Sequence, residues 1–419
     1  MKILWITNTL FPEAQALITG SGELRGSGGW MIASAEMLTK QPDIVLAIAT
    51  VSSLVDELKV VMGNSILFYV LPFGKGNLKY NSEYEGFWKQ VKKDFQPDVA
   101  HIHGTEFSHG LSYITACGDQ NVVVSLQGLK SGIAPYYCAG ITHKEILRNI
   151  TFRDLIKGSI LSEQNKFEES GSTIEKSILS QVKHIIGRTA WDKAHAWSIN
   201  PNAEYHFCNE TLRSEFFDGS KWNYEKCEKH TIFLSQAGYP LKGLHQVLRA
   251  MPLILRHYPN AKIRVAGNDI TKYKSLRDKI RISGYGMYIR RLIHKLHLEN
   301  HIEFLGPLNA EQMKQAYLDC NVFICPSSIE NSPNSLGEAQ LLGVPHIASY
   351  VGGVPDMMVG NRENLYRFEE VHMIAEEICK IFKDKDEQID MSSFAFQRHA
   401  PLNNTNNLIK IYHQIYEHK

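Results

Sequence analysis

The sequence predicts an α/β protein built from two doubly wound parallel sheets. Short, continuous apolar runs alternate with longer segments of helical periodicity, as in parallel strands that helices cover on both faces. This alternation runs through the first 200 residues and starts again after a polar, irregular stretch at 200–230. The chain has 419 residues, whereas a single hydrophobic core usually stops growing at roughly 250–300. We therefore expect two Rossmann-like domains facing a cleft.

The expected strands fall into two series. The first series is KILWIT (2–7), IVLAIATV (44–51), DVAHIH (98–103), VVVSLQ (122–127) and HIIGR (184–188). The second series is TIFLSQ (231–236), KIRVAG (262–267), IEFLG (302–306), VFICPS (322–327) and PHIAS (345–349). The tail NNLIKIYHQIYEH predicts a final helix, because it spaces apolar residues at helical intervals: Leu408, Ile411, Tyr412 and Ile415.

Composition and charge exclude several classes of protein. The formal net charge is +1, so the chain as a whole has no electrostatic attraction to nucleic acid. The seven cysteines include no C-x-x-C pair, which favours a reducing compartment. No apolar run reaches the ~18–20 residues that span a bilayer, and the N-terminal run lacks the features of a signal peptide. We expect a cytoplasmic protein that is at most peripheral on the inner membrane face.

The stretch IENSPNSLGEAQLLGVP at 329–345 carries the clearest chemical signal. It follows an expected strand, and Ser332 and Pro333 suit the N-cap and first position of a helix. Gly343 suits the position just after the helix end. Glu330 would then lie on a loop at the carboxyl end of a strand, where open parallel sheets bind ligands. Glu338 would lie about two turns into the helix.

These two carboxylates beside a helix start favour a ligand with phosphates and hydroxyls. The N–H groups of a helix N-terminus attract phosphate, and carboxylates accept hydrogen bonds from sugar or ribose hydroxyls. A nucleotide-sugar combines both features.

The motif E-x7-E, followed by GVP and by GGVPD at 352–356, resembles the signature of the family-4 (group 1) retaining glycosyltransferases of the GT-B fold. Four further motifs resemble that family in the expected order: GSGGW (26–30), DVAHIHG (98–104), HIIGRTAWDK (184–193) and QAGYPLKGLHQVL (236–248). The resemblance covers most of the chain. It implies an acceptor-side domain at 1–205 with a crossover helix at about 402–419, and a nucleotide-sugar donor domain at 206–401.

The resemblance also implies roles for individual residues. Glu330 would face the donor sugar, Glu338 would hold the ribose hydroxyls, and Lys242 would meet the diphosphate. The implied catalytic residues are Glu330, Lys242 and Gln127. The implied donor-binding residues are Glu338, Asn334, Ser335, Leu336, Gly28, Gly29 and Arg188.

Two positions depart from the family pattern. Ala237 stands where the family usually has an arginine, and Gln127 stands where it often has a histidine. Glutamine keeps hydrogen bonding but carries no proton charge. The diphosphate would therefore lack one cation, unless Arg188 or a member of the basic segment 272–295 supplies it. The sequence does not choose between them.

The function implied is transfer of a sugar from a UDP- or GDP-linked donor to an acceptor hydroxyl, with retention and without a metal or cofactor. The implied acceptor is a glycan or a lipid-linked molecule of cell-surface polysaccharide or glycolipid assembly. Two alternatives remain open. A nucleotide-sugar epimerase or phosphorylase of the same fold is one, and donor turnover without acceptor would favour the epimerase. A non-catalytic sugar-nucleotide-binding partner is the other, motivated by Ala237 and Gln127; it would bind nucleotide without turnover.

Two further features have weaker signals. Residues 143–157 carry a net charge of +2 and place Ile146, Leu147 and Ile150 on one helical face. We expect this segment, within the first domain, to dock on anionic lipid, although a solvated helix face is the simpler alternative. His101 and His103 are two residues apart on an expected strand, so both side chains lie on the same face of it. We expect core histidines rather than a metal pair, because no third ligand is placed nearby.

Overall fold

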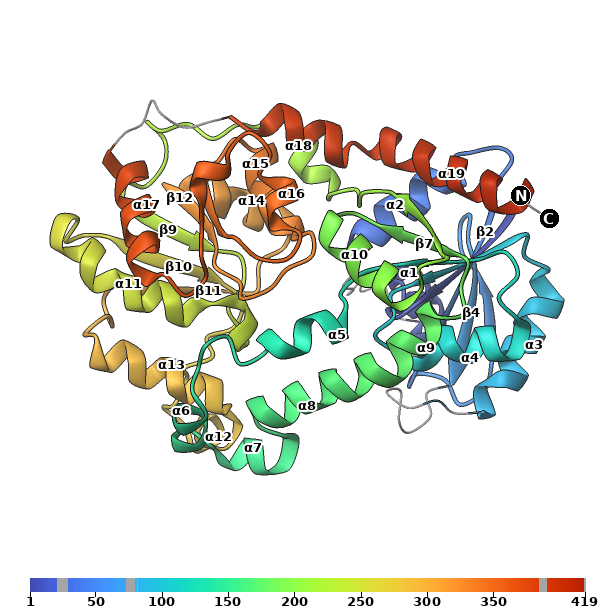
Figure 1. Cartoon of the computed structure of the whole chain (residues 1–419), viewed down its shortest axis with the longest axis horizontal. Coiled ribbons are helices and arrows are strands. Elements are labelled where there is room, and N and C mark those ends of the chain that lie inside the picture. The colour runs from blue at the N-terminus through green and yellow to red at the C-terminus, as the bar shows by residue number, and fades with distance from the viewer. Residues whose placement is uncertain (21–28, 73–79, 81, 384–389, 418–419) are drawn as a thin grey trace. The chain divides into compact units, whose positions relative to one another are not determined.

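The computed structural model describes residues 1–20, 29–72, 80, 82–383 and 390–417. The chain forms two compact units (Figure 1). Unit 1 comprises Met1–Gly132, Glu168–Arg213 and Arg398–Lys419, and unit 2 comprises Ile133–Phe167 and Ser214–Gln397.

Unit 1 is built on a sheet of eight strands in the order β3-β4-β2-β1-β5-β6-β7-β8. The strands pair in parallel, except that β3 runs antiparallel to β4 at one edge. Their bounds are Lys2–Thr7 (β1), Val45–Ser52 (β2), Lys59–Met62 (β3), Leu67–Pro72 (β4), Val99–His103 (β5), Val122–Ser125 (β6), His184–Gly187 (β7) and Glu204–Phe207 (β8).

Helices cover both faces of this sheet. Their bounds are Pro12–Thr19 (α1), Gly29–Thr39 (α2), Glu83–Phe95 (α3), Ser108–Cys117 (α4), Lys130–Ile133 (α5), Lys176–Leu179 (α9), Ala190–Ile199 (α10) and Pro401–Glu417 (α19). Two further helices, Ile160–Ser170 (α8) and Ser392–His399 (α18), each begin in unit 2 and end in unit 1. The final helix α19 packs beside α2, as Figure 1 shows. Its four predicted apolar residues are buried in one layer with Trp5, whose indole N–H donates to the Tyr412 hydroxyl at 2.9 Å. The expected helical tail is thus confirmed.

Unit 2 is built on a six-stranded, all-parallel sheet in the order β11-β10-β9-β12-β13-β14. The strands are Thr231–Leu234 (β9), Lys262–Ala266 (β10), Ile302–Gly306 (β11), Val322–Cys325 (β12), His346–Ser349 (β13) and Leu365–Tyr366 (β14). The helices are His143–Arg148 (α6), Phe152–Lys157 (α7), Leu244–His257 (α11), Leu276–Arg281 (α12), Gly284–Lys295 (α13), Ala310–Asp319 (α14), Asn334–Leu341 (α15), Val354–Met357 (α16) and Val371–Lys383 (α17). Every strand of both predicted series is present, with bounds that differ by at most two residues.

The sequence analysis missed β3, β4, β8 and β14. Strand β8 reads EYHF inside the polar stretch at 200–230, and only one of its side chains is buried. Strand β3 is a short, mostly exposed edge strand, and β14 has two residues. These three are edge strands, which bury one side at most, so their sequences lack the continuous apolar run on which the prediction relied. Strand β4 lies inside the sheet, and its run LFYVLP is mostly buried, so its sequence did carry that signal.

Residues 133–167 belong to unit 2, which corrects their placement in the first domain. The physical reason is their packing. Ile141 and Ile146 are buried in the apolar core that α11 and α13 form over the unit 2 sheet. The boundary after the first series also shifts, from 205 to Arg213.

All seven cysteines are free thiols. Within the described residues, no helix has the length and apolar character needed to traverse a bilayer.

Candidate functional site

Loops after adjacent strands of unit 2 bring Lys242 and Glu330 together. Lys242 ends the short 3-10 helix Pro240–Lys242, which follows β9, and Glu330 lies in the loop after β12. The Lys242 ammonium lies 2.5 Å from Glu330 Oε1, and the Ser327 hydroxyl donates to the same oxygen at 2.7 Å. The carboxyl edge of this sheet therefore presents an ion pair between two residues that the sequence analysis chose separately.

The backbone of the two loops is in close contact. The amide of Ser328 donates to the carbonyl of Leu241 at 2.8 Å. Gly243 has a φ of +70°, and a Cβ at this position would lie 1.7 Å from the carbonyl oxygen of Pro326. The Lys-Gly pair is thus required for two reasons: lysine supplies the charge, and glycine lets the second loop approach.

A third loop, after β13, contacts the backbone of Glu330. The amide of Gly353 donates to the Glu330 carbonyl at 3.0 Å. A Cβ on Gly352, where φ is +50°, would lie 2.0 Å from that same oxygen. The glycines of the GGVPD motif therefore fix the backbone of Glu330, which explains why the two motifs occur together.

Lys242 keeps its charge despite its burial. Its side chain is 14% exposed and that of Glu330 is 15% exposed. Burial alone would lower the pKa of Lys242, but the Glu330 carboxylate raises it above its usual value. Ala237 is buried in the apolar core of unit 2 and supplies no group to this site. Among the positions singled out for the diphosphate, Lys242 is the cation that the structure places beside Glu330.

The helix after Glu330, α15, begins one residue later than expected. Asn334 is its first residue and Pro333 is its N-cap, so the expected N-cap role of Ser332 is wrong. The Ser332 hydroxyl lies instead 3.6 Å from Met357 Sδ. The N-cap residue Pro333 has no side-chain group that could accept a hydrogen bond from this helix start. Its first turn is formed by the three residues predicted to bind the donor: Asn334, Ser335 and Leu336.

Glu338 lies on the buried side of α15. The Tyr317 hydroxyl lies 3.3 Å from its Oε2 and 2.9 Å from the carbonyl oxygen of Ser335. Tyr317 is itself fully buried on α14. Gly343 follows the helix with a φ of +72°, as expected for a helix end.

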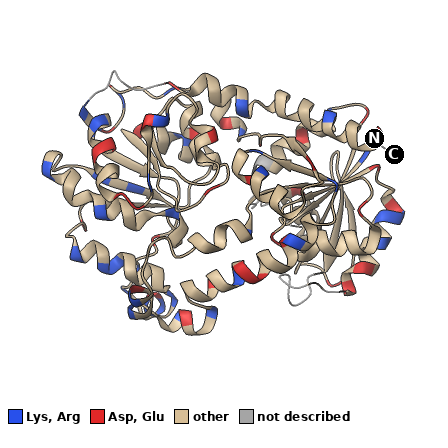
Figure 2. Cartoon of the chain, viewed as in Figure 1, with Lys and Arg blue, Asp and Glu red and all other residues tan. Residues whose placement is uncertain are grey.

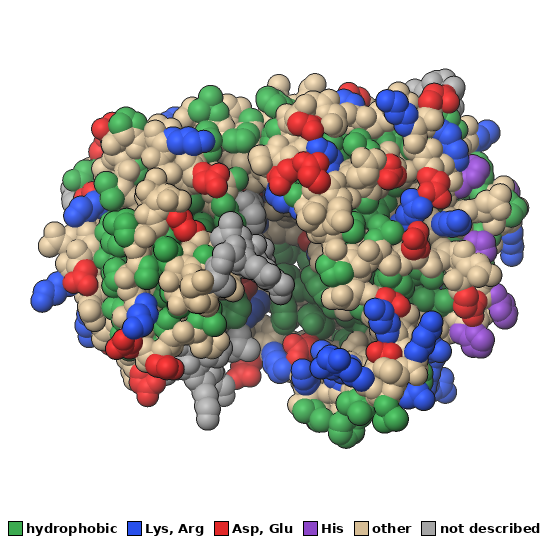
Figure 3. All heavy atoms as spheres, turned by 180° about the vertical axis from the view of Figure 1, so that it is seen from behind, with side chains coloured by type: hydrophobic (Ala, Val, Ile, Leu, Met, Phe, Trp, Pro, Cys, Tyr) green, Lys and Arg blue, Asp and Glu red, His purple; other side chains and the backbone are tan. Residues whose placement is uncertain are grey.

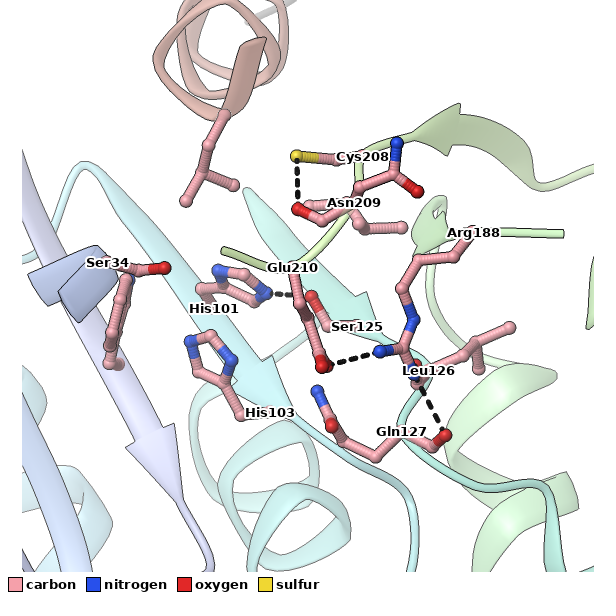
Figure 4. Close-up of a pocket in the computed structure, with 13 residues that line it drawn as sticks. Ser34, His101, His103, Ser125, Leu126, Gln127, Arg188, Cys208, Asn209 and Glu210 are labelled. Atoms are coloured by element: carbon pink, nitrogen blue, oxygen red, sulfur yellow. Dashed lines mark hydrogen bonds and ion pairs between the residues drawn. The ribbon is translucent and has the colours of Figure 1, made fainter. Parts of the chain in front are cut away.

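Unit 1 has a separate small cavity at the carboxyl edge of its sheet (Figure 4). Its volume of about 40 Å³ holds a few water molecules. The lining residues come from four strands (β1, β5, β6 and β7) and the loops and helices near them: Trp5, Ser34, His101, His103, Ser125, Leu126, Gln127, Ile186, Arg188, Cys208, Asn209, Glu210 and Leu408. Two predicted residues, Gln127 and Arg188, are among them.

Arg188 is held by partners within unit 1. Its guanidinium pairs with Glu210 at 2.6 Å and donates to the carbonyls of Leu126 and Gln127 at 3.0 Å. These contacts give Arg188 a structural task, joining the loop after β6 to the segment after β8. Gly29 is the first residue of α2, and Gly28 lies outside the described residues.

The two histidines of β5 are buried, as expected. The Tyr412 hydroxyl lies 2.6 Å from His101 Nδ1, and Ser125 hydrogen-bonds to Nε2. Burial lowers the pKa of His101 well below its ordinary value and that of His103 to about 3. Both rings are therefore neutral at pH 7.

The sequence analysis missed a buried polar cluster in unit 1. Glu175 accepts hydrogen bonds from the backbone amides of Lys130 and Ser131, at 2.6 and 3.1 Å. The Lys130 ammonium reaches the carbonyl of Glu106 and, at 2.9 Å, the Ser170 hydroxyl. Burial raises the pKa values of Glu106 and Glu175. The single charged residues in the stretches LQGLKSGIA and HGTEFSHG could have indicated this cluster. Its hydrogen-bonded partners, however, lie up to 70 residues apart in the sequence.

Part of the chain is similar in sequence to known glycosyltransferases. Residues 219–398 match the model of the family "Glycosyl transferases group 1". The chain is 30% identical over 131 residues to an uncharacterised glycosyltransferase of Methanocaldococcus jannaschii, covering 31% of this chain and 30% of that protein. It is 23% identical over 178 residues to a GDP-mannose-dependent phosphatidylinositol monomannoside mannosyltransferase of Mycobacterium tuberculosis, covering 41% and 43%. The matches thus span less than half of these curated relatives.

The fold is shared over the whole chain with a solved structure. Sucrose-phosphate synthase from Thermosynechococcus elongatus aligns with a TM-score of 0.71 at 15% identity, covering 100% of both chains. This likeness establishes the GT-B architecture that the sequence predicted.

Proposed function

Because residues 219–398 match the model of the family "Glycosyl transferases group 1" and the fold is GT-B, we propose that the chain is a retaining glycosyltransferase. It moves a sugar from a UDP- or GDP-linked donor to an acceptor hydroxyl. The observation that carries this proposal is the Lys242–Glu330 pair at the carboxyl edge of the unit 2 sheet, in the loops next to the start of α15.

Donor binding replaces the contact between Lys242 and Glu330 by contacts of each residue with the donor. Without donor, the Lys242 charge is held by Glu330. When the diphosphate arrives, Lys242 turns to it, and the Glu330 carboxylate becomes available to hydroxyls of the sugar. Glu338 accepts hydrogen bonds from the ribose. The pair therefore keeps both charges neutralised until the donor supplies replacements for each.

Catalysis rests on stabilising the leaving group. As the glycosidic bond breaks, the sugar develops oxocarbenium character and negative charge grows on the diphosphate. The Lys242 ammonium and the amides at the start of α15 face that charge without a metal ion. Unit 1 supplies the acceptor side, and Gln127 at its cavity is the residue that we propose to act there.

A screen of nucleotide-sugars by thermal shift tests the proposal. A ligand that binds only the folded state raises the melting temperature. We expect a UDP- or GDP-sugar to raise it and the matching nucleoside monophosphate to raise it less. Incubating the selected donor with acceptors then separates the alternatives. Turnover of the donor alone indicates an epimerase, and binding without turnover on any acceptor indicates a non-catalytic partner.

The lipid-docking surface predicted from 143–157 has a different composition from the one expected. Ile146 is buried in the unit 2 core, so it does not share a surface with Leu147. The surface instead combines helices α6, α7 and α12, and we call it the apolar tip. Its members are 41 to 78% exposed: Leu147, Ile150, Phe152, Leu155, Ile156, Leu276 and Ile280. Hydrophobic side chains gather in this way at the lower edge of Figure 3.

Hydrogen bonds hold the segments of the apolar tip together, and these segments carry an excess of positive charge. The Thr151 hydroxyl donates to the carbonyl of Ile282 at 2.8 Å, and Asp154 accepts from the amide of Gly284 at 3.1 Å. Residues 143–157 and 275–281 carry seven Lys and Arg against three Asp and Glu, and Figure 2 shows blue stretches of ribbon among these helices. Apolar side chains rimmed by cations suit the interface of an anionic bilayer.

We propose that the apolar tip docks the protein on anionic lipid, where a lipid-linked acceptor would be found. The double variant Leu155→Glu/Ile156→Glu should lower vesicle binding by more than tenfold, because each fully buried Leu or Ile is worth ~1.5–3 kcal/mol. Co-sedimentation with vesicles of neutral and anionic phospholipid measures it. Leu402→Glu is the control, because Leu402 is an exposed leucine of unit 1 that lies outside the apolar tip. Equal binding to both vesicle types, or none, would contradict docking.

A further inference from the structure

Two histidines and a glutamate meet at the edge of the unit 1 sheet, at the opposite strand ends from the cavity. His184 is the first residue of β7, and Glu204 is the first residue of β8, the edge strand. The register pairs His184 with Glu204 and Ile186 with His206. Side chains two residues apart share a face of a strand, so the parallel register brings all three side chains to the same face.

The three side chains converge on one point. His184 Nδ1 lies 3.1 Å from His206 Nε2, 3.6 Å from Glu204 Oε2, and His206 Nε2 lies 3.9 Å from Glu204 Oε1. The first separation suits a hydrogen bond between imidazoles. The other two are too long for a hydrogen bond. Hydrogen bonding therefore accounts for the contact between the two imidazoles but not for the position of the Glu204 carboxylate beside them.

A shared metal ion accounts for all three. Zinc binds imidazole nitrogen and carboxylate oxygen at about 2.0–2.2 Å. Ligand atoms at those distances in a tetrahedron lie roughly 3.3–3.5 Å from one another, which falls within the observed range of 3.1–3.9 Å. A small rotation of the exposed Glu204 side chain would close its two longer approaches.

We propose that His184, Glu204 and His206 form a Zn²⁺ site. The histidine side chains are 13% and 6% exposed, which fixes their rings, and Glu204 is 55% exposed, which leaves an entry path and room for a water as the fourth ligand. Within the part of the chain that the structure describes, this is the cluster whose spacing suits a metal ion.

The ion would join the edge strand to its neighbour. Strand β8 has four residues and is paired on one side only. The chain continues from β8 to Glu210, whose carboxylate pairs with Arg188 beside the cavity. A metal at the start of β8 would thus hold in place the strand that positions Glu210. This site is independent of the proposed glycosyl transfer.

Isothermal titration of metal-free, untagged protein with ZnCl₂ tests the site, with thermal shift as a second readout. We expect about one ion per chain, by analogy with three-ligand zinc sites, and a higher melting temperature with zinc. His184→Gln, His206→Gln and Glu204→Gln should each weaken binding by more than ~10-fold, since even a partner outside the ligand shell is worth about 10–100-fold. Glu204 is exposed, so Glu204→Gln remains informative if a histidine variant misfolds.

His294→Gln is the matched control, because His294 also pairs with a glutamate, Glu299, at 2.8 Å on the surface of unit 2. It should bind zinc as the unaltered chain does. Cobalt replacing zinc should give the intense visible absorption of a tetrahedral site, absent in Glu204→Gln. Zinc binding that none of the three variants changes would assign it to other groups, such as the thiols. No binding would leave a hydrogen-bonded histidine pair. Either result overturns the proposal.

Discussion

Replacing Lys242 by alanine is expected to lower kcat/KM for sugar transfer by about 10²–10³-fold or more, the loss seen when one group that stabilises a developing oxyanion is removed. The effect should be large because the position of the usual second cation is occupied by the buried Ala237. The structure places Lys242 against Glu330 with its pKa raised above the ordinary value, so the lysine is fully charged at neutral pH. Steady-state kinetics with the donor chosen by the thermal-shift screen measures the loss.

Stability must be separated from catalysis in this experiment. Lys242→Ala leaves the largely buried Glu330 carboxylate without its cation, which for a fully buried pair costs ~3–5 kcal/mol. The double variant Lys242→Met/Glu330→Gln removes both charges and should recover melting temperature but not activity. Lys314→Ala is the matched control. Lys314 is a similarly buried lysine on α14, and it pairs with Asp218 at 2.6 Å. It should lose stability and keep most of its kcat/KM. Near-normal transfer by Lys242→Ala would exclude its catalytic role.

Replacing Glu338 by alanine is expected to weaken donor binding by about 10–150-fold. Hydrogen bonds to a charged group are worth ~1.5–3 kcal/mol, and ~1.4 kcal/mol is a factor of ten in Kd. The Tyr317 hydroxyl, 3.3 Å from the carboxylate, orients it without neutralising it. Titration calorimetry with the donor measures the change, and Glu311→Ala, an exposed carboxylate on α14, controls for net charge.

A donor that lacks the ribose hydroxyls identifies the partner of Glu338. If the carboxylate holds the ribose, the 2′,3′-dideoxy donor should bind weakly to the unaltered protein and lose little more in Glu338→Ala. This non-additivity is the signature of a direct contact. Equal losses for both donors would show that Glu338 acts elsewhere, and unchanged donor affinity in the folded variant would remove it from the site.

The predicted strands, the two-sheet fold and the motif around Glu330 followed from local features of the sequence. Buried parallel strands are continuous apolar runs, and a glycine after a helix, such as Gly343, marks a backbone angle that other residues avoid. The choice of Lys242, Glu330 and Glu338 came from motifs in the right order along the chain. All three residues could be assigned to one domain from the sequence alone, because each lies among the strands of the second series along the chain.

Only the tertiary structure decided what depends on contacts between distant segments. The 88-residue separation of Lys242 and Glu330 closes to 2.5 Å because β9 and β12 are neighbours in the sheet. Residues 133–167 join unit 2 because Ile146 fits its core, although the chain enters that segment from unit 1. Arg188 is turned toward Glu210, and His184, Glu204 and His206 meet through the pairing of an edge strand that the sequence did not reveal. Strand order and packing set these contacts, and neither is encoded in the periodicity of any single segment.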